Sequence, residues 1–470
     1  MHTDSLTNKN SIMDIKDILS SGMATEQKIA ELKQKSIEVP SWAILRREYD
    51  PELHGVMDKA KYPDIIGEDG LITPVTRVAV DYQRLAVKRT TELCFGIPVK
   101  RVYKTKADDA TQQEVAEALE AIFQRCRIDS LNIERGRMLF AGCEVMTMWY
   151  GTQQENTVYG FPSKLKMRAL NFSPMLGDKL YPLFDEYGDM VAMSVEYTRN
   201  RAGADVTYFD AFTAERHIRW NNAEGWDVDV DEEINIGKIP AIYVWRPTPV
   251  WDGTTTLVNE IEWALSRNGN YLRENSRPIV ACFADDAVQF GDSPDVDKAA
   301  KDVMQLPSNA RLEYITWPAA IENLKYYVGE LRQMFFTQLQ LPDWSYESMK
   351  TTPMSGEARK QMFIDAQLKV KDESGRWLEF FDREVNVVKA FLKQMRPEWA
   401  GIIDQLEVEN VITPYAINDE MEEINKMSTL AGGKQLISQR TAIERLDYVD
   451  DVDAELLRIA EEGAIDALGM

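Results

Sequence analysis

A turn-rich segment between two strongly helical patterns constrains this chain most. The segment runs from Leu341 to Met354, contains Pro342 and Pro353, and is otherwise rich in small and polar residues. Because such residues do not continue a helix, the segment must project or turn back. Ser355 is placed to cap the next helix. Loops longer than the usual ~4–6 residues are more often functional than idle, so this one is a candidate functional element.

The length and the charge of the chain exclude several classes of protein. Its 470 residues exceed the ~250–300 at which a single core stops growing, so we expect several domains or an elongated subunit of an assembly. The 54 basic and 77 acidic residues give a net charge of −23, which repels nucleic acid on average and leaves DNA contact to local cations. Neither a secretory signal nor a long apolar run is visible, so we expect no export by a signal peptide and no membrane contact.

The sequence contains no pattern typical of a catalytic, cofactor or metal site. Four cysteines, with no C-x-x-C pair, are expected to be reduced core thiols. They are Cys94, Cys126, Cys143 and Cys282. The three histidines lack metal-ligand or triad neighbours, and the acidic runs at 227–233 and 450–453 lack the spacing of a calcium loop. A phosphate-binding loop of the ATPase type is also absent, so we expect no enzyme.

The apolar periodicity predicts helices first and a sheet second, the order of an α+β fold. Helical spacing covers 75–93, 112–123 and 128–139. From Glu144 the period changes to two, in short aromatic and β-branched segments separated by glycine, asparagine and aspartate. This pattern favours an antiparallel meander. Residues 1–45 are interpreted as an arm.

Two further helices bracket a small strand-containing unit. The first helical pattern covers 256–275 and the second begins near Ile321, while 278–283 and 311–317 are predicted strands joined through an acidic excursion. Apolar residues recur at spacings of three and four in both helices, as in a helix-packing seam, which fits either a projecting pair or two ordinary core helices. The seam residues are Leu257, Ile261, Leu265, Ile321, Leu324, Val328 and Leu331.

The longest helical pattern follows the turn-rich segment. It covers 355–395, and Ser374-Gly375 in its middle predict a kink or a break. The acidic tail from Gly401 has apolar residues at helical spacing. We therefore expect the tail to be folded helix rather than disordered acid.

Five short motifs in a fixed order carry a family resemblance. They are Cys-Phe-Gly-Ile-Pro-Val at 94–99, Gly-Lys-Ile-Pro-Ala-Ile-Tyr-Val at 237–244, Ser-Gly-Glu-Ala at 355–358, Ile-Ser-Gln-Arg-Thr-Ala at 437–442 and Asp-Ala-Glu-Leu at 453–456. In their order and spacing, from about residue 75 to residue 465, the chain resembles the portal proteins of tailed double-stranded-DNA bacteriophages, in the Gp6-like or phage-head portal family.

The resemblance implies a ring, expected to be a homododecamer, at one vertex of the capsid. It also implies an α+β portal fold with a helical and β wing, a helical stem, a small α/β clip, a tunnel loop and a helical crown. The parts map onto an N-terminal arm and wing at 1–251, stem helices at 252–276 and 319–343, the clip at 277–318, the tunnel loop at 344–358, a long wing helix at 359–400 and the crown at 401–470. The role of residues 1–60 stays open.

The partners that the resemblance implies are double-stranded DNA without sequence preference, the terminase large subunit, a head–tail adaptor or connector, and the major capsid or scaffolding protein. The implied location is the portal vertex of the virion, with the host cytoplasm during assembly. In the tunnel loop, the DNA-facing residues would be Lys350, Thr351, Thr352 and Met354. In the stem channel they would be Lys325 and Arg332. The docking residues of the clip would be Asp285, Asp286, Asp292 and Asp295.

Three alternatives remain at this stage. An acidic intracellular hydrolase would need two carboxylates that converge in a pocket with shifted pKa values. A head–tail connector would also form a ring, but such adaptors are usually much shorter. Lys350 itself could be an ordinary solvated lysine, because surface lysines are common.

Overall fold

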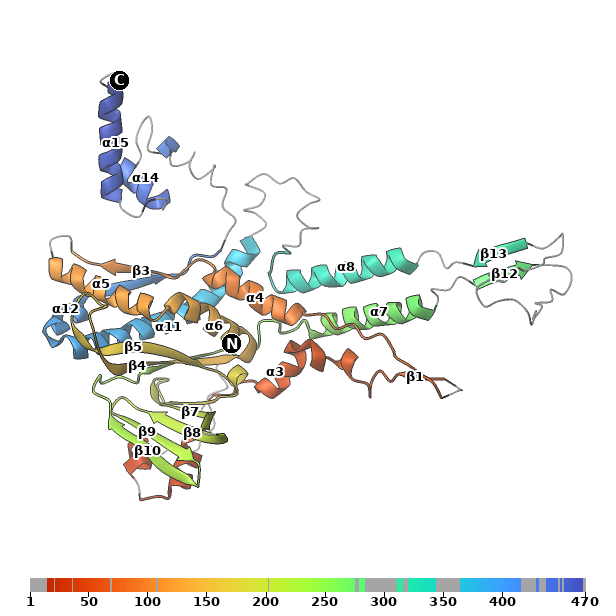
Figure 1. Cartoon of the computed structure of the whole chain (residues 1–470), viewed down its shortest axis with the longest axis horizontal. Helices are drawn as coiled ribbons and strands as arrows, with labels where there is room; N and C mark the ends of the chain where they lie inside the picture. Colours follow the sequence, from red (N-terminus) through yellow and green to blue (C-terminus); the bar gives the residue numbers. More distant parts are fainter. Residues whose placement is uncertain are drawn as a thin grey trace.

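The protein has a mixed helical and stranded body from which a pair of helices projects (Figure 1). The computed structural model describes residues 15–20, 22–35, 37–67, 70–106, 109–201, 203–274, 279–283, 311–315, 320–343, 364–415, 428–430, 437–446, 449 and 452–467. The tunnel loop at 344–358 and the acidic residues expected to dock partners in the clip lie outside these ranges.

Two antiparallel sheets form the stranded part of the body. The smaller has the order β11-β4-β5 and the larger is a meander of the order β10-β9-β8-β7-β6. The smaller sheet consists of β4 (Glu144–Asn156), β5 (Ser163–Phe172) and β11 (Ala241–Trp245). The larger consists of β6 (Lys179–Phe184), β7 (Met190–Arg201), β8 (Ala204–Phe212), β9 (Arg216–Asn222) and β10 (Trp226–Glu233). The predicted strands and their antiparallel pairing are confirmed, although the meander is one of two sheets.

Four helices pack with the smaller sheet around the main core. They are α4 (Tyr82–Phe95), α5 (Ala110–Arg125), α6 (Ile128–Gly142) and α11 (Ile364–Met395). Aromatic side chains dominate their contact, because the ring of Trp377 on α11 meets those of Phe95 and Phe140 edge to face. A buried ion pair crosses the same core, where Arg135 donates to Glu384 at 2.8 Å. Burial of large rings on α11 makes this helix the centre of the body.

The chain after α11 returns to the body. A 3-10 turn (η4, Pro397–Trp399) and α12 (Ala400–Gln405) lead into β14 (Glu407–Val411), which pairs antiparallel with β3 (Lys100–Lys104). The crown was expected to begin at 401, but residues 400–411 pack with α5 and α11. The later helices α14 (Gln439–Leu446) and α15 (Val452–Ala467) contact each other.

The N-terminal arm packs on the larger sheet. Its helices α1 (Ile15–Ser20) and α2 (Thr25–Leu32) bury Ile18 and Ile29 against Phe209 and Trp220 of that sheet. The chain then continues through α3 (Trp42–Tyr49), η1 (Pro51–Leu53), η2 (Gly55–Met57) and the short strands β1 (Ile65–Ile66) and β2 (Ile72–Thr73). Helices α1 and α2 of the arm are therefore part of the folded body.

The projecting pair consists of α7 (Thr255–Glu274) and α8 (Ala320–Gln338), which pack against each other. The antiparallel strands β12 (Ile279–Phe283) and β13 (Arg311–Ile315) lie at its far end (Figure 1). The sequence predicted both helices and both strands, and the structure confirms these elements.

Two predicted details are wrong. Helix α11 is continuous through Ser374 and Gly375, because both residues lie away from the core while Val370 and Trp377 are buried on either side. The helix predicted over 75–93 begins only at Tyr82, and the preceding residues are extended. In both places tertiary contacts decide the local structure.

Three cysteine side chains are described, and all three are free thiols. Burial raises the pKa of Cys94, Cys126 and Cys143 to about 12 in each case, so the reactive thiolate is scarce at neutral pH. No helix in the described ranges is long and apolar enough to cross a membrane. Within those ranges, no three histidine, cysteine, aspartate or glutamate side chains form a group that could hold a metal ion.

We predict that Gly375→Ala stabilises the protein by about 0.5–1 kcal/mol, because glycine is entropically unfavourable in a helix interior. A Cβ at this position would meet no atom within 4 Å. The matched control is Gly136→Ala in α6, whose Cβ would lie 2.9 Å from ring atoms of Phe95 and should be destabilising. Urea unfolding midpoints test both variants, and a destabilised Gly375→Ala would contradict a continuous α11.

Candidate functional site

The candidate site is the pair α7–α8, here called the stem, together with the contacts that hold its inner end. This end joins the body, and among the described residues the other end carries β12 and β13 (Figure 1). The contacts at the inner end therefore determine the direction in which the stem projects.

An extended segment, residues 74–81, lies along α7 and is held by polar side chains of that helix. Every second residue of the segment donates its backbone N–H, and the accepting side chains on α7 are four residues apart. Two extended residues advance about 6.6 Å and four helical residues about 6 Å, so the two spacings match. The hydrogen bonds run from Val80 N to Glu262 Oε1 at 2.9 Å, from Val78 N to Ser266 Oγ at 2.8 Å and from Thr76 N to Asn270 Oδ1 at 2.5 Å.

A glycine permits this close approach. A Cβ on Gly269 would lie 2.7 Å from Cγ2 of Thr76, which is closer than two carbon atoms can approach without a shift of the segment. One turn further along α7, Arg273 donates to the carbonyl oxygen of Pro74 at 3.1 Å. Glycine and polar side chains thus form one stripe on α7 that fits the extended backbone.

The inner end of the stripe is a buried ion pair. Nδ1 of His54 lies 2.6 Å from Oε1 of Glu262, and Nε2 lies 2.7 Å from the carbonyl oxygen of Glu48. The two side chains are 4% and 0% exposed. A carbonyl oxygen only accepts, and so does an ionised carboxylate. Both ring nitrogens of His54 therefore carry protons when Glu262 is ionised.

The pKa of His54 reflects this geometry. Burial alone would lower it, but the hydrogen bond and charge of Glu262, the carbonyl of Glu48 and the charge of Asp81 together raise it above the ordinary 6.5. The protonated imidazole therefore persists to higher pH in the folded protein than in the unfolded chain.

The inner end of α8 is attached to the body by two cations. Lys369 of α11 donates to the carbonyl oxygen of Leu339 at 2.5 Å, and Arg89 of α4 donates to that of Pro342 at 2.8 Å. Burial lowers the pKa of Lys369 to about 8. The chain leaves the helix through Gln340, which has a φ of 55°. The chain at the end of α8 is thus held to α4 and α11 through the carbonyl oxygens of Leu339 and Pro342.

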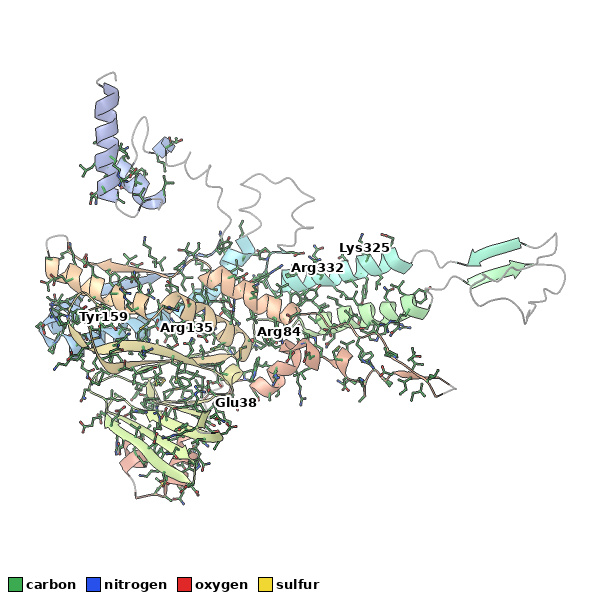
Figure 2. All side chains as sticks on the ribbon, viewed as in Figure 1. Glu38, Arg84, Arg135, Tyr159, Lys325 and Arg332 are labelled. Carbon is green, nitrogen blue, oxygen red and sulfur yellow. The ribbon has the colours of Figure 1, made fainter. Side chains whose placement is uncertain are left out.

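Of the two cations predicted for the stem channel, Arg332 forms an ion pair within the chain. Arg332 donates to Asp343 at 2.5 Å, and Arg89 lies 3.8 Å from the same carboxyl group. The charge of Arg332 is therefore paired with that of Asp343 within the chain. Lys325 is exposed on α8, and Figure 2 marks both residues.

The seam predicted to lie between subunits is partly buried within one chain. Ile261 and Leu331 are buried inside a single chain, and Leu257 packs against the main core. Leu265, Leu324 and Val328 are half-buried. The side chain of Ile321 lies outside the described residues. Contacts within the chain therefore bury part of this seam and leave the rest half-exposed.

Other apolar side chains of the stem remain exposed. Tyr326 is 70% exposed. Further exposed large apolar side chains are Trp263, Leu272, Tyr327 and Met334. Their signal in the sequence is weak, because an aromatic residue off the seam looks like any other helix position. They give the stem an apolar surface beyond its internal contact.

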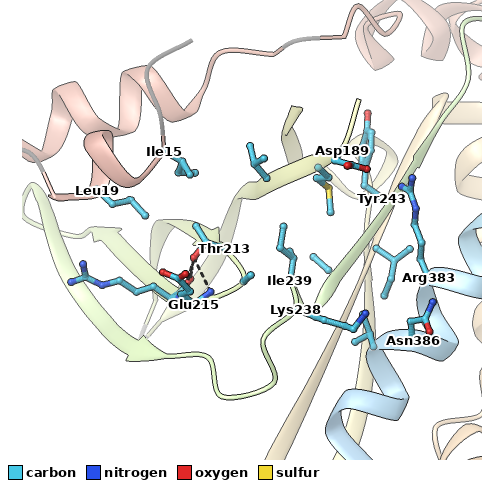
Figure 3. A pocket seen from close by; sticks show the side chains of 17 residues that line it. Ile15, Leu19, Asp189, Thr213, Glu215, Lys238, Ile239, Tyr243, Arg383 and Asn386 are labelled. Atoms are coloured by element: carbon cyan, nitrogen blue, oxygen red, sulfur yellow. Dashed lines mark hydrogen bonds between the residues drawn. The ribbon is translucent and has the colours of Figure 1, made fainter. Parts of the chain in front are cut away.

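A cavity of about 850 Å³ lies between the arm, both sheets and α11 (Figure 3). Ile15 and Leu19 of α1 form one wall, and Ile239 and Val387 contribute to the others. Sequence spacing could not reveal it, because its walls come from widely separated segments. Its mixed lining, with cations and carboxylates at several points, does not single out one chemistry.

The raised pKa of His54 predicts a pH-dependent contribution to stability. A group whose pKa is higher in the folded state stabilises it fully below the unfolded pKa, and this stabilisation is lost as the pH rises through the folded pKa. The urea midpoint of the native sequence should therefore exceed that of His54→Gln most at about pH 6, and the difference should shrink towards about pH 9. Glu262→Gln should remove the same dependence. A difference that stays constant or grows with pH would contradict this pairing.

Comparison with known proteins assigns a family. The family model described as "Phage portal protein, SPP1 Gp6-like" matches residues 32–467. No curated protein matches the chain.

The solved structures with similar folds include three from gene transfer agent (GTA) particles. The neck of the empty particle, computed with C6 symmetry, has a TM-score of 0.42 and 9% identity, over 87% of this chain and 99% of that chain. The neck of the native particle, with C12 symmetry, has a TM-score of 0.39 and 9% identity, over 87% and 94%. The virion of the native particle has a TM-score of 0.38 and 11% identity, over 90% and 99%. Because the family model spans nearly the whole sequence, this chain belongs to the SPP1 Gp6-like family of phage portal proteins.

Proposed function

We propose that twelve copies of this portal protein form a closed ring in which the stems surround a channel for double-stranded DNA, during both packaging and ejection. The family match supports the portal function over the hydrolase and the connector considered from the sequence. The observation that carries the arrangement is the projecting pair α7–α8, which is anchored at one end and keeps exposed apolar side chains along its length.

The exposed apolar side chains of the stem supply a driving force for the ring. Removing a large apolar side chain from water contributes about 1.5–3 kcal/mol. Each copy exposes Tyr326 and Met334 on α8 and Trp263 on α7, and a contact between copies would bury this apolar surface. A ring repeats one contact between successive copies and leaves no unpaired flank.

The charge distribution suits a conduit through which DNA slides. A net charge of −23 limits tight binding of the phosphate backbone, while a few cations permit weak contact without reading bases. Lys325 on the stem is one such cation, and Lys350 in the tunnel loop is the other that we propose. The proposal for Lys350, Thr351, Thr352 and Met354 rests on the sequence, because these residues lie outside the described ranges.

Docking of partners is proposed at the end of the stem that carries β12 and β13. This end is the furthest from the body (Figure 1), so it is accessible to the terminase large subunit during filling and to a head–tail adaptor afterwards. The acidic residues proposed for docking, Asp285, Asp286, Asp292 and Asp295, lie outside the described ranges. The wing is the proposed contact for the capsid or scaffolding protein.

Native mass spectrometry of the purified chain tests the ring. The wild type should give one closed oligomer, and the double variant Tyr326→Asp/Met334→Asp should give folded but unassembled subunits. The substitutions remove apolar side chains from the contact, and assembly would have to take the new carboxylates out of water, which is unfavourable. The control is Tyr187→Asp, an exposed residue in the turn between β6 and β7, which should leave the ring intact. Double-variant rings that are as stable as those of the wild type would refute the stem contact.

Crosslinking tests the DNA conduit. A photoreactive group at Thr351 should label DNA in filled heads regardless of base sequence, because the proposed contacts are with phosphate and sugar. The same group at Tyr187 should label protein only. Labelling of capsid protein alone from Thr351 would place this loop outside the channel.

A further inference from the structure

The short hairpin of β1 and β2 carries an exposed apolar surface. Ile65, Ile66, Leu71 and Ile72 are 50–72% exposed. Ile66 pairs with Ile72, so these two side chains share one face, while Ile65 lies on the other opposite Thr73. A two-stranded hairpin is at best marginally stable alone in water. Burial of its apolar faces against another surface would therefore stabilise the hairpin.

The hairpin has a built neck that holds it in place. Asp64 accepts hydrogen bonds from Val75 N at 3.0 Å and from Arg77 at 2.8 Å. The same guanidinium group donates to the carbonyl oxygen of Tyr62 at 2.5 Å. These contacts join the two strands at their base, and the extended segment that follows is bound to α7. The apolar surface is thus presented in a fixed position, which lowers the entropy cost of docking.

The hairpin lies beside the stem, on the flank of α7 opposite to α8. The extended segment contacts the side of α7 that carries Glu262, whereas Tyr327 of α8 donates to Glu260 at 3.0 Å. Glu260 and Glu262 are two residues apart on α7, which places them about 200° apart around the helix axis. The segment and α8 therefore lie on nearly opposite sides of α7. Figure 1 agrees, with β1 and α8 on either side of α7.

This arrangement has two complementary flanks. In a ring, each copy contacts one neighbour through one flank and the other neighbour through the opposite flank. The flank with the hairpin would then face the α8 flank of the next copy, which exposes Tyr326 and Met334. Thr76 binds Asn270 near the outer end of α7, so the hairpin emerges beside the stem, where a neighbouring stem would stand.

We propose that the hairpin 65–73 of one copy docks on the exposed side of α8 in the next copy and forms a clasp between adjacent stems. The inference rests on the proposed ring. A second copy of this chain is the occupant because the uncovered apolar surfaces lie on opposite flanks of the same stem, as a repeating contact between copies requires.

A photoreactive amino acid at Ile66 in the full chain tests the clasp. Rings assembled from a mixture of isotopically light and heavy subunits should give light–heavy crosslinked dimers, with the adduct on residues 320–343. A matched probe at Tyr187, in the wing, should not label α8. Closed rings whose Ile66 adducts fall elsewhere, or within one chain only, would overturn the clasp and leave the ring itself standing. Failure of the wild type to form rings would instead refute the proposed function.

A paired substitution gives an independent measure. Ile66→Asp/Ile72→Asp places two charges on one face of the hairpin, and because that face is uncovered in the isolated chain, circular dichroism of the subunit should not change. The subunit concentration at which rings dissociate should rise at least about tenfold. Tyr187→Asp should leave that concentration unchanged. An unchanged dissociation concentration for the paired variant would contradict the clasp.

Discussion

The carboxylate of Glu262 is the contact on which the direction of the stem depends. It accepts from the backbone of Val80 and pairs with His54, so three segments of the chain meet at one buried group. An ionised carboxylate without a partner in this position would be strongly destabilising, by about 3–5 kcal/mol. His54 and the backbone N–H of Val80 both bind Oε1, whereas Oε2 is buried and has no hydrogen-bond partner among the described residues. From there, the polar stripe of α7 continues the attachment along the extended segment.

The second stem helix is attached by different chemistry. Cations from α4 and α11 bind the carbonyl oxygens that follow α8, namely those of Leu339 and Pro342. Helix α11 is in turn fixed in the core by Trp377 and by the pair of Arg135 with Glu384. Each stem helix therefore has its own connection to the body.

Periodicity in the sequence predicted most of the helices and strands, because those elements bury one face and show it in the spacing of apolar residues. It failed where a distant partner decides the conformation. Residues 75–81 have helical apolar spacing, but side chains of α7 bind their backbone N–H groups. No strand was predicted for the acidic run at 227–233. It forms the exposed edge strand β10, because β9 supplies its hydrogen bonds.

The same limit applies to the candidate site. The seams of α7 and α8 could be predicted from spacing, but their burial inside one chain could not, because periodicity does not say which helix covers a face. His54 and Glu262 are 208 residues apart, and no local pattern joins them. The exposed hairpin was missed because an apolar pair of short strands looks the same in sequence whether it is buried or not.

The position of the stems in the assembled particle decides whether they form the channel. Single-particle electron cryomicroscopy of the purified full-length protein measures this directly. The map should show a closed ring viewed down its axis, with α7 and α8 of every copy around the central channel and the hairpin 65–73 against the next α8. A ring whose stems lie at the outer rim, away from the channel, would contradict the account.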